Sequence, residues 1–417
     1  MKRFLFSVLS VMLLISIVLS VTSCTETEYD SEEAVSAAAT AAVLTNEGDT
    51  KSDISEKNSS TSSKKSAVSK APKTSSKPVE VDSYYQALIE KKLKKYNFNG
   101  VVRVSKKGKV LCEVANGKMS SDSDKDITTD TLFAIASCSK QFTAAAIMIL
   151  KDDGKLSVSD TIDKYFPKYK YGKDITIKNL LTMRSGVPDF LNESSSFKKY
   201  DASKNASEKK NREVTLNWIF KHGLNYTPDG AYYYSNSNYF LLAEIVEKVS
   251  GMSFSDFLEE RIFTPLGMND TASNEELAYS DRLAVSDVDP WDLPGIKAKE
   301  QPLTIRVKGL NVGNGGLIST AADMDKWLSS LSGNKILSKE SIKEMSKDYN
   351  PYADHYGYGV MVAKNGAIWH VGALDYYASY TYTIPKKEYN FFAVTNDTLS
   401  MTTDIYTFAN DIIKSTK

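Results

Sequence analysis

Ser137 and Lys140 are spaced so that the two residues could act together in nucleophilic catalysis. Positions i and i+3 lie on one face of a helix, so the ammonium of Lys140 can lie beside the hydroxyl of Ser137. A serine hydroxyl is a weak nucleophile that needs an adjacent base or cation to react. The apolar run after Lys140 stops near Gly154 and predicts a helix whose start carries Ser137. Taken alone, the same four residues are more simply a solvated helix start.

A second polar group, Tyr234-Ser235-Asn236, directly precedes an apolar run at helical spacing that ends at Gly251. The pattern places Tyr234 and Asn236 on a loop that caps a helix. The Asn236 amide could donate to a substrate carbonyl and hold Lys140 in place. A close ammonium such as that of Lys140 would lower the pKa of Tyr234 and favour the phenolate. Alone, the group is better explained as a tyrosine-rich turn before a core helix.

A third group, His370-Val371-Gly372, lies in a segment rich in β-branched and aromatic residues that predicts a strand, a turn and a second strand. Glycine inside a strand often marks a close approach of the backbone to a ligand or another strand. The N–H groups of Ala373 and Ser137 could then stabilise an oxyanion. A single histidine on a strand is more often a packing or surface residue.

In this order, the three groups resemble the motifs of the serine β-lactamase and penicillin-binding protein superfamily. The closest resemblance is to the branch of class C β-lactamases, D-alanyl-D-alanine carboxypeptidases, D-aminopeptidases and esterases. The similarity covers roughly residues 82 to 417. Further segments resemble motifs of this family, and they are Leu180–Pro188 (LLTMRSGVP), Thr264–Met268 (TPLGM), Gly315–Met324 (GGLISTAADM) and Val394–Asn396 (VTN).

This resemblance implies an α/β, β-lactamase-like (transpeptidase-like) fold with two lobes. One lobe would be an antiparallel sheet flanked by the terminal helices, and the other would be helical. Ser137 would be the acylated nucleophile, Lys140 would activate it, and Tyr234 would shuttle protons. The residues implied in substrate binding are Asn236, His370, Gly372 and Ala373. Neither a cofactor nor a metal is expected.

The chain departs from the family pattern at two places. His370 stands where many lactamases have lysine, so a fixed cation for a substrate carboxylate is missing at neutral pH. This favours a peptide or ester substrate over a β-lactam. Protonation of His370 below about pH 6.5 would restore the charge and raise activity on anionic substrates. Met183-Arg184 replaces the usual His-Thr.

The first 23 residues predict a secretory signal, with Lys2 and Arg3 followed by an apolar run from Phe4 to Val21. Val21–Cys24 resembles a bacterial lipobox, in which Cys24 would be lipidated. Stable attachment to the extracellular face of the cytoplasmic membrane would follow from a two-chain lipid anchor. The alternative is an uncleaved transmembrane anchor, since the apolar run is barely long enough to span a bilayer.

Residues 24–81 predict a disordered tether, because they are rich in Ser, Thr and Lys and contain almost no aromatic residue. The hydrolase domain would occupy residues 82–417. Lys and Arg together number 52, as do Asp and Glu, so the chain is neutral and nothing indicates nucleic-acid binding. We expect a monomer whose substrate is a small molecule or a peptidoglycan-type peptide. Cys112 and Cys138 could pair, but two buried thiols are favoured.

The sequence also predicts the order of the main elements. We expect a helix over residues 82–96, a hairpin of 101–104 and 109–114, a mostly helical middle, strands near 357–396 and a closing helix over 399–416.

The most direct interpretation is a membrane-tethered serine hydrolase that forms an acyl-enzyme at Ser137. It would act on D-amino-acid peptides or small esters, as a carboxypeptidase or an esterase. The alternatives are a class C-like β-lactamase and a non-catalytic penicillin-binding wall or sensor lipoprotein. A solute-binding lipoprotein would share the anchor and the tether but would not explain the three motifs.

Overall fold

The computed structural model describes residues 82–120, 123–191, 206–285, 308–333, 335–374, 376–398 and 401–416. The predicted signal peptide, Cys24 and the whole predicted tether (residues 24–81) lie outside this described part. No helix within these ranges is both long and apolar enough to cross a membrane.

The two ends of the described chain share one antiparallel sheet with the strand order β2-β1-β9-β8-β7-β6. Strands β8 and β9 are buried along their whole length because both faces of the sheet are covered. The strand bounds are β1 Gly100–Lys106, β2 Lys109–Asn116, β6 Met361–Val362, β7 Ile368–Leu374, β8 Tyr377–Ile384 and β9 Tyr389–Thr395. Lys107 and Gly108 both have positive φ, as the tight β1–β2 hairpin requires.

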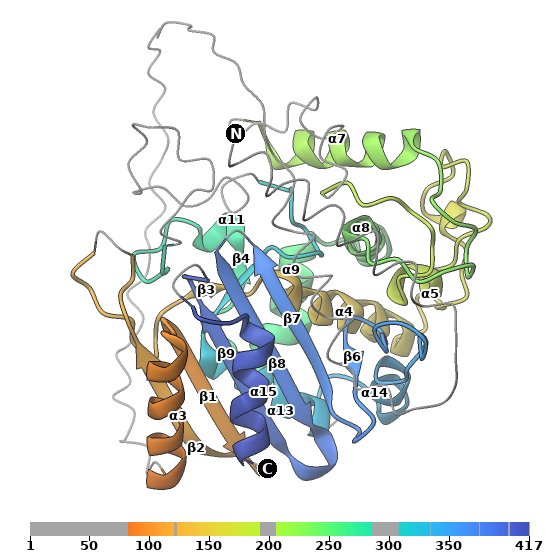
Figure 1. The fold of residues 1–417 in the computed structure, drawn as a ribbon. Helices are drawn as coiled ribbons and strands as arrows, with labels where there is room; N and C mark the ends of the chain where they lie inside the picture. The colour runs from red at the N-terminus through yellow and green to blue at the C-terminus, as the bar shows by residue number, and fades with distance from the viewer. Residues whose placement is uncertain are drawn as a thin grey trace, which may run out of the picture. The chain divides into compact units, whose positions relative to one another are not determined.

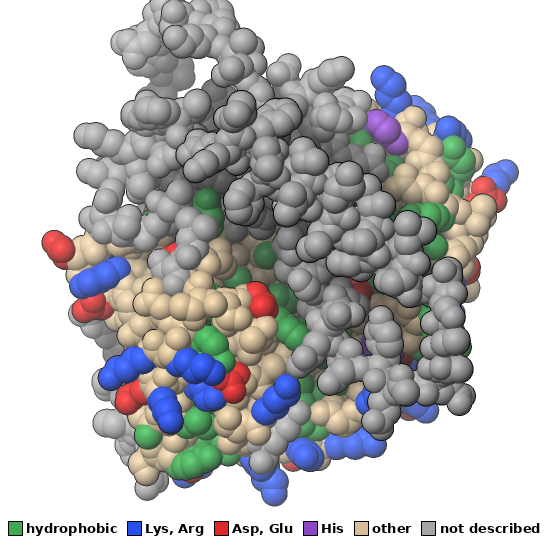
Figure 2. Space-filling view, in the orientation of Figure 1, with side chains coloured by type: hydrophobic (Ala, Val, Ile, Leu, Met, Phe, Trp, Pro, Cys, Tyr) green, Lys and Arg blue, Asp and Glu red, His purple; other side chains and the backbone are tan. Residues whose placement is uncertain are grey.

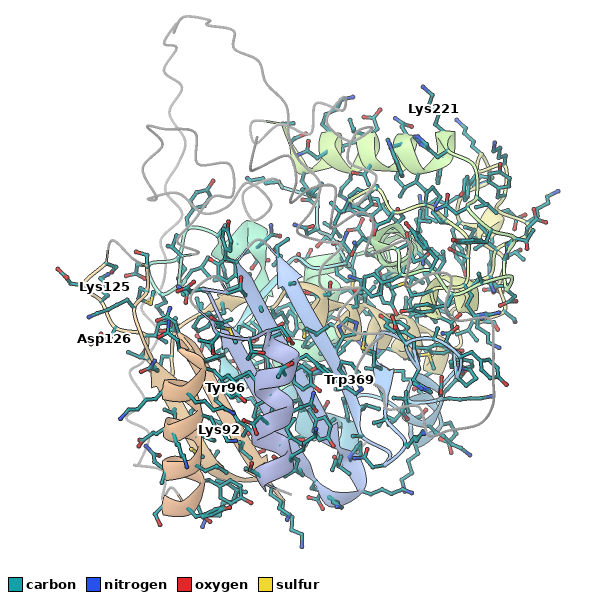
Figure 3. All side chains as sticks on the ribbon, in the orientation of Figure 1. Lys92, Tyr96, Lys125, Asp126, Lys221 and Trp369 are labelled. Atoms are coloured by element: carbon teal, nitrogen blue, oxygen red, sulfur yellow. The ribbon has the colours of Figure 1, made fainter. Side chains whose placement is uncertain are left out.

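Two helices cover one face of this sheet, α3 (Ser83–Tyr96) and α15 (Ile405–Thr416), both in front of it in Figure 1. Asp82 caps α3 by accepting from the N–H of Tyr84. Lys92 and Tyr96, labelled in Figure 3, both bind Asp411 of α15, at 2.7 and 2.5 Å. Basic and acidic side chains gather together on the surface over α3 (Figure 2), so that face carries no single-sign field.

The other face carries α13 (Ala321–Gly333), behind which the helical part of the chain packs. Helices α4 (Lys140–Asp152) and α8 (Asn236–Ser250) form its centre and contact each other. A small second sheet, in the order β3-β5-β4, joins the two parts. The remaining bounds are β3 Phe133–Ala134, η1 Ala136–Ser139, η2 Ile162–Lys164, α5 Ile177–Leu181, α7 Glu208–Lys221, α9 Phe254–Leu258, η3 Glu259–Phe263, α10 Thr264–Leu266, β4 Ala272–Ser273, α11 Asn274–Leu277, β5 Leu317–Ser319, α14 Lys339–Met345 and η4 Pro385–Lys387.

The element order follows the sequence prediction closely. The first helix, the first hairpin, the helical middle and the late strands are all present. The closing helix begins at Ile405, after the predicted start at residue 399, and residues 399–400 are not described. The predicted α/β fold, an antiparallel sheet with terminal helices plus a helical part, is confirmed.

Candidate active site

Ser137 lies on a 3-10 turn, Ala136–Ser139, and Lys140 begins the α-helix that follows. The α-helix therefore begins one turn later than the sequence predicted. Ala136 has a φ of 46°, a left-handed conformation that a residue with a side chain adopts at a cost of about 1–3 kcal/mol. Ser137 is half-buried, whereas its neighbours from Thr131 to Ala136 are buried. The strained turn thus presents the hydroxyl at the surface.

The side chain of Lys140 is buried and its Nζ is held by three oxygen atoms. Nζ lies 3.0 Å from Ser137 Oγ, 2.8 Å from Asn236 Oδ1 and 2.6 Å from the carbonyl oxygen of Asn314. The last two oxygens only accept hydrogen bonds. A neutral amine has two N–H donors and one lone pair, so donation to these two oxygens points the lone pair at Ser137. The geometry is that of a base beside its nucleophile.

Burial lowers the pKa of Lys140 from 10.5 to about 7, while the charge of Asp189 opposes the shift. A buried lysine loses the hydration that stabilises its ammonium form. At neutral pH, a large share of Lys140 is therefore neutral and can take the proton of Ser137. A general base is most effective when its pKa lies near the working pH.

Tyr234 stands directly before α8, as the sequence predicted, and its hydroxyl hydrogen-bonds with Ser137. Lys140 Nζ lies 4.9 Å from the centre of the Tyr234 ring. The predicted lowering of the Tyr234 pKa is wrong, because burial raises this pKa well above 10. Desolvation of the phenolate outweighs the hydrogen bond with Ser137, which lowers the pKa. Tyr234 is therefore a protonated donor and relay at neutral pH.

Met183, which replaces the usual histidine of the motif that Leu180–Pro188 resembles, holds the segment that carries Tyr234. Its sulfur accepts from the N–H of Ser235 at 3.4 Å and from Asn238 Nδ2 at 3.2 Å. Its carbonyl accepts from the N–H of Tyr233 at 2.9 Å. Met183 thus fixes the chain on both sides of Tyr234. Arg184, the second departure, binds the carbonyl of Asp229 instead of any catalytic group.

His370 is buried on β7, so its imidazole is not suited to the charged role that the sequence suggested. Nε2 lies 3.1 Å from the Tyr356 hydroxyl, and Nδ1 lies 2.6 Å from the carbonyl of Val371. Burial, helped by the nearby Lys140, lowers the pKa of His370 to about 3. The expected gain of charge below about pH 6.5 is therefore wrong. His370 therefore stays neutral over the pH range around 7 in which Lys140 gains or loses its proton.

Gly372 makes the close backbone approach that a glycine in this strand predicted. A Cβ at this position would lie 2.4 Å from the carbonyl oxygen of Ile135 and 3.0 Å from the nitrogen of Ser137. Only glycine lets β7 run this close to the nucleophile. Ala373, the next residue, is exposed. Strand β6 pairs only with Ile368 and Trp369, so it does not pair with this stretch of β7.

Cys112 and Cys138 are both free and buried, which confirms the preference for two separate thiols. Burial raises their pKa values to about 12 and about 11, so both remain unreactive thiols at neutral pH. Cys24, the predicted lipidation site, lies outside the described residues. Within those residues, no group of three or more His, Cys, Asp or Glu side chains could hold a metal ion.

Two residues that the sequence did not single out complete the surroundings of Lys140, one by direct contact and one through Asn236. Asn314 supplies a carbonyl oxygen to its Nζ, and Asp189 accepts from Asn236 Nδ2 at 3.0 Å. Each directly adjoins a segment that resembles a family motif, Gly315–Met324 and Leu180–Pro188. Their position next to these motifs was the one feature of the sequence that could have marked them as site residues. Tyr356, the partner of His370, had none, because its position depends on how the loop before β6 folds.

Comparison with known proteins bears on the family and the fold of the chain. The family model described as Beta-lactamase matches residues 85–413, which is well over half of the chain. Penicillin-binding protein 4* of Bacillus subtilis is 34% identical over 210 residues, covering 50% of this chain and 44% of that protein. Teichoic acid D-alanine hydrolase of Staphylococcus aureus is 27% identical over 275 residues, covering 65% of this chain and 64% of that protein. The chain thus spans less than half the length of the first of these relatives and less than two thirds of the second.

Among solved structures, the octameric penicillin-binding protein homologue from Pyrococcus abyssi superposes with a TM-score of 0.67 and 26% identity. The superposition covers 80% of this chain and 76% of that one. The expected fold is therefore shared with proteins of known structure. Taken with the match over residues 85–413, these similarities show that the chain belongs to the β-lactamase and penicillin-binding protein family of serine hydrolases.

Proposed function

We propose that this protein is an extracellular, membrane-tethered serine hydrolase that forms an acyl-enzyme at Ser137 and acts on D-amino-acid peptides or small esters. The observation that carries the proposal is the buried Lys140, whose Nζ lies 3.0 Å from Ser137 Oγ and is oriented by two carbonyl oxygens. Burying a lysine beside a serine lowers stability because the amine loses its hydration, and this favours a catalytic role over a purely structural one.

In the acylation step, Ser137 Oγ attacks the substrate carbonyl while its proton moves to Lys140 Nζ. The carbonyl oxygen becomes an oxyanion, for which the N–H groups of Ser137 and Ala373 are the expected donors. When the intermediate collapses, the bond to the leaving amine or alcohol breaks. Tyr234, which remains protonated and bonds Ser137, gives its proton to that leaving group and regains one from Lys140.

Deacylation runs the same transfers with water as the nucleophile. Water gives a proton through Tyr234 or directly to Lys140 and attacks the ester carbonyl, and the proton then returns to Ser137 Oγ. Both half-reactions need Lys140 neutral at the start. The pKa of about 7 makes that state available at neutral pH.

The choice of substrate class rests on charge and on the relatives. His370 is neutral and buried, so β7 offers no fixed cation from this position for the carboxylate of a β-lactam. One of the relatives is named a teichoic acid D-alanine hydrolase, which supports an ester or amide of a D-amino acid as the substrate.

A substrate panel tests this preference. We expect hydrolysis of p-nitrophenyl butyrate and of a D-alanyl ester, with nitrocefin turned over at least about tenfold to a hundredfold less efficiently, the loss expected without an ion contact of about 1.5–3 kcal/mol. The L-alanyl ester is the matched control, because it differs only in configuration. Nitrocefin turnover should also fall below about pH 6.5, because Lys140 becomes protonated there and His370 stays neutral, so that no new cation offsets the loss of the base. Efficient nitrocefin hydrolysis at pH 7.5 would favour the class C-like β-lactamase.

The tether is proposed from the sequence, in which the lipobox ends at Cys24 and a polar segment follows. The mature protein should begin at a lipidated Cys24 and partition into detergent. Replacing Cys24 with alanine is expected to abolish uptake of a fatty-acid probe, whereas Cys112→Ala should leave it intact because Cys112 is buried in the folded domain. Continued probe uptake by Cys24→Ala would contradict the lipoprotein assignment.

A further inference from the structure

Asp189 is a fully buried carboxylate, and a single side chain, that of Asn236, links it to Lys140. Its Oδ2 accepts from Asn236 Nδ2 at 3.0 Å, and its Oδ1 accepts from the N–H of Leu191 at 2.9 Å. Asn236 Oδ1 in turn accepts from Lys140 Nζ at 2.8 Å. The side chains therefore form a continuous series from Asp189 through Asn236 and Lys140 to Ser137.

Asp189 is held in place from both sides by one residue of α8. The Ser237 hydroxyl donates to the carbonyl of Pro188 at 2.6 Å and accepts from the N–H of Phe190 at 3.1 Å. Ser185, at the start of the same loop, bonds Asn238. The loop is thus fixed to the first turn of the helix that carries Asn236. Asp189 and Asn236 have little freedom to move apart.

The contacts of Asn236 depend on which way its amide is turned. The two ends of an asparagine amide have nearly the same shape, so neighbours decide between them. Lys140 needs an acceptor, and the carboxylate of Asp189 offers only acceptors. In the opposite orientation, Oδ1 would face the carboxylate and Nδ2 would face the amine, so both contacts would be lost.

We propose that Asp189 is a positioning residue that fixes the amide of Asn236 and, through it, keeps Lys140 Nζ directed at Ser137. This inference rests on the proposed acyl-enzyme function and assigns to it a residue that does not touch the substrate, since Asp189 has no exposed surface. An amide nitrogen carries two N–H groups, and Asp189 takes one of them. The fixed orientation leaves the other N–H of Asn236 for the substrate carbonyl that the proposed function assigns to it.

The charge of Asp189 also acts on Lys140. Burial lowers the Lys140 pKa, and the negative charge of Asp189 raises it again. Burial raises the Asp189 pKa itself, and the N–H donors and Lys140 oppose that change. The other titratable groups that face Lys140 in the described residues are neutral at pH 7. Burial raises the pKa of the thiol and of the two phenols, and it lowers the pKa of the imidazole. These groups are Cys138, His370, Tyr234 and Tyr239.

The test compares the full-length wild type with Asp189→Asn and Asp189→Ser. The first readout is kcat/KM for p-nitrophenyl butyrate between pH 5 and 9. The second is the titration of Lys140 by NMR in protein labelled with 13C-lysine, with Lys140→Met assigning the signal. Asp323→Asn is the matched control, because Asp323 is also a buried carboxylate but bonds Thr271 and Lys326 instead of the site.

We expect Asp189→Asn to lower kcat/KM about tenfold or more and to move the Lys140 titration about one unit toward lower pH, since an attractive charge has been removed. Asp189→Ser should move it in the same direction, and Asp323→Asn should leave it in place. A Lys140 titration that moves no further in the two Asp189 variants than in the control would overturn the inference. The two proposals can fail separately. If wild-type Ser137 is never acylated, the proposed function is wrong. The NMR titration of Lys140 does not depend on acylation, so it still decides the role of Asp189.

Discussion

Replacing Ser137 with alanine is expected to abolish both hydrolysis and covalent labelling while the fold remains intact. The oxygen that forms the acyl bond is lost, and Lys140 then has no proton to accept from this position. In enzymes whose catalytic residues act as a unit, removing the nucleophile lowers kcat by about 10⁶-fold. The measurement is intact mass after reaction with a fluorophosphonate or a fluorescent penicillin, beside hydrolysis of p-nitrophenyl butyrate.

Ser139 provides the matched control for this experiment because it lies in the same 3-10 turn. Its hydroxyl accepts from the N–H of Leu317 at 3.1 Å, whereas Lys140 Nζ bonds Ser137, Asn236 and Asn314. Ser139→Ala should lose some stability but retain the mass shift. Labelling of Ser137→Ala at the wild-type rate, with loss of label in Ser139→Ala, would move the nucleophile to the other serine.

The fold and the direct contacts of the site could be predicted from local pattern together with the resemblance to a known family, which implied that Tyr234 and Asn236 act with Ser137 and Lys140. The i, i+3 spacing brings Ser137 and Lys140 together whether the turn is a 3-10 turn or an α-helix. Tyr234 and Asn236 adjoin a helix that the apolar spacing had already located. Gly372 was informative because a strand that passes this close to another backbone segment leaves no room for a Cβ.

The charge states could not be predicted in the same way, because they depend on burial, and burial is a property of the folded core. Both wrong expectations have this origin. From the sequence, Lys140 was expected to be a cation that would favour the Tyr234 phenolate, and His370 was expected to have the ordinary imidazole pKa. In the structure, desolvation moves the pKa of Lys140 down, that of Tyr234 up and that of His370 down. Each shift favours the neutral form of its group.

The same reasoning explains why Asp189 escaped notice. An aspartate after Val187-Pro188 in a polar loop is an ordinary surface residue by composition. Its role arises only because Ser237 binds the loop to the start of α8, which brings the carboxylate against Asn236. No spacing within either segment encodes that contact, since residues 189 and 236 are far apart in the chain.

Lys140→Met should be nearly as damaging as loss of the nucleophile. Methionine fills a similar volume but cannot accept the Ser137 proton, so we expect kcat/KM for p-nitrophenyl butyrate to fall by about 10³-fold or more. Lys151→Met is the matched control, since Lys151 lies in the last turns of the same helix and pairs with Glu344 at 2.7 Å near the surface. That variant should keep wild-type activity.

The pH dependence distinguishes a base from a merely structural lysine. Lys140 must be neutral to act, so wild-type kcat/KM should be level above its pKa of about 7 and fall about tenfold per pH unit below it. Lys140→Met should lose this limb together with the rate, and the residual activity should follow hydroxide or vanish. Suppose instead that Lys140→Met folds, retains activity within tenfold of the wild type and keeps the same acidic limb. The proton of Ser137 would then go to another group, and the assignment of Lys140 as the base would be wrong.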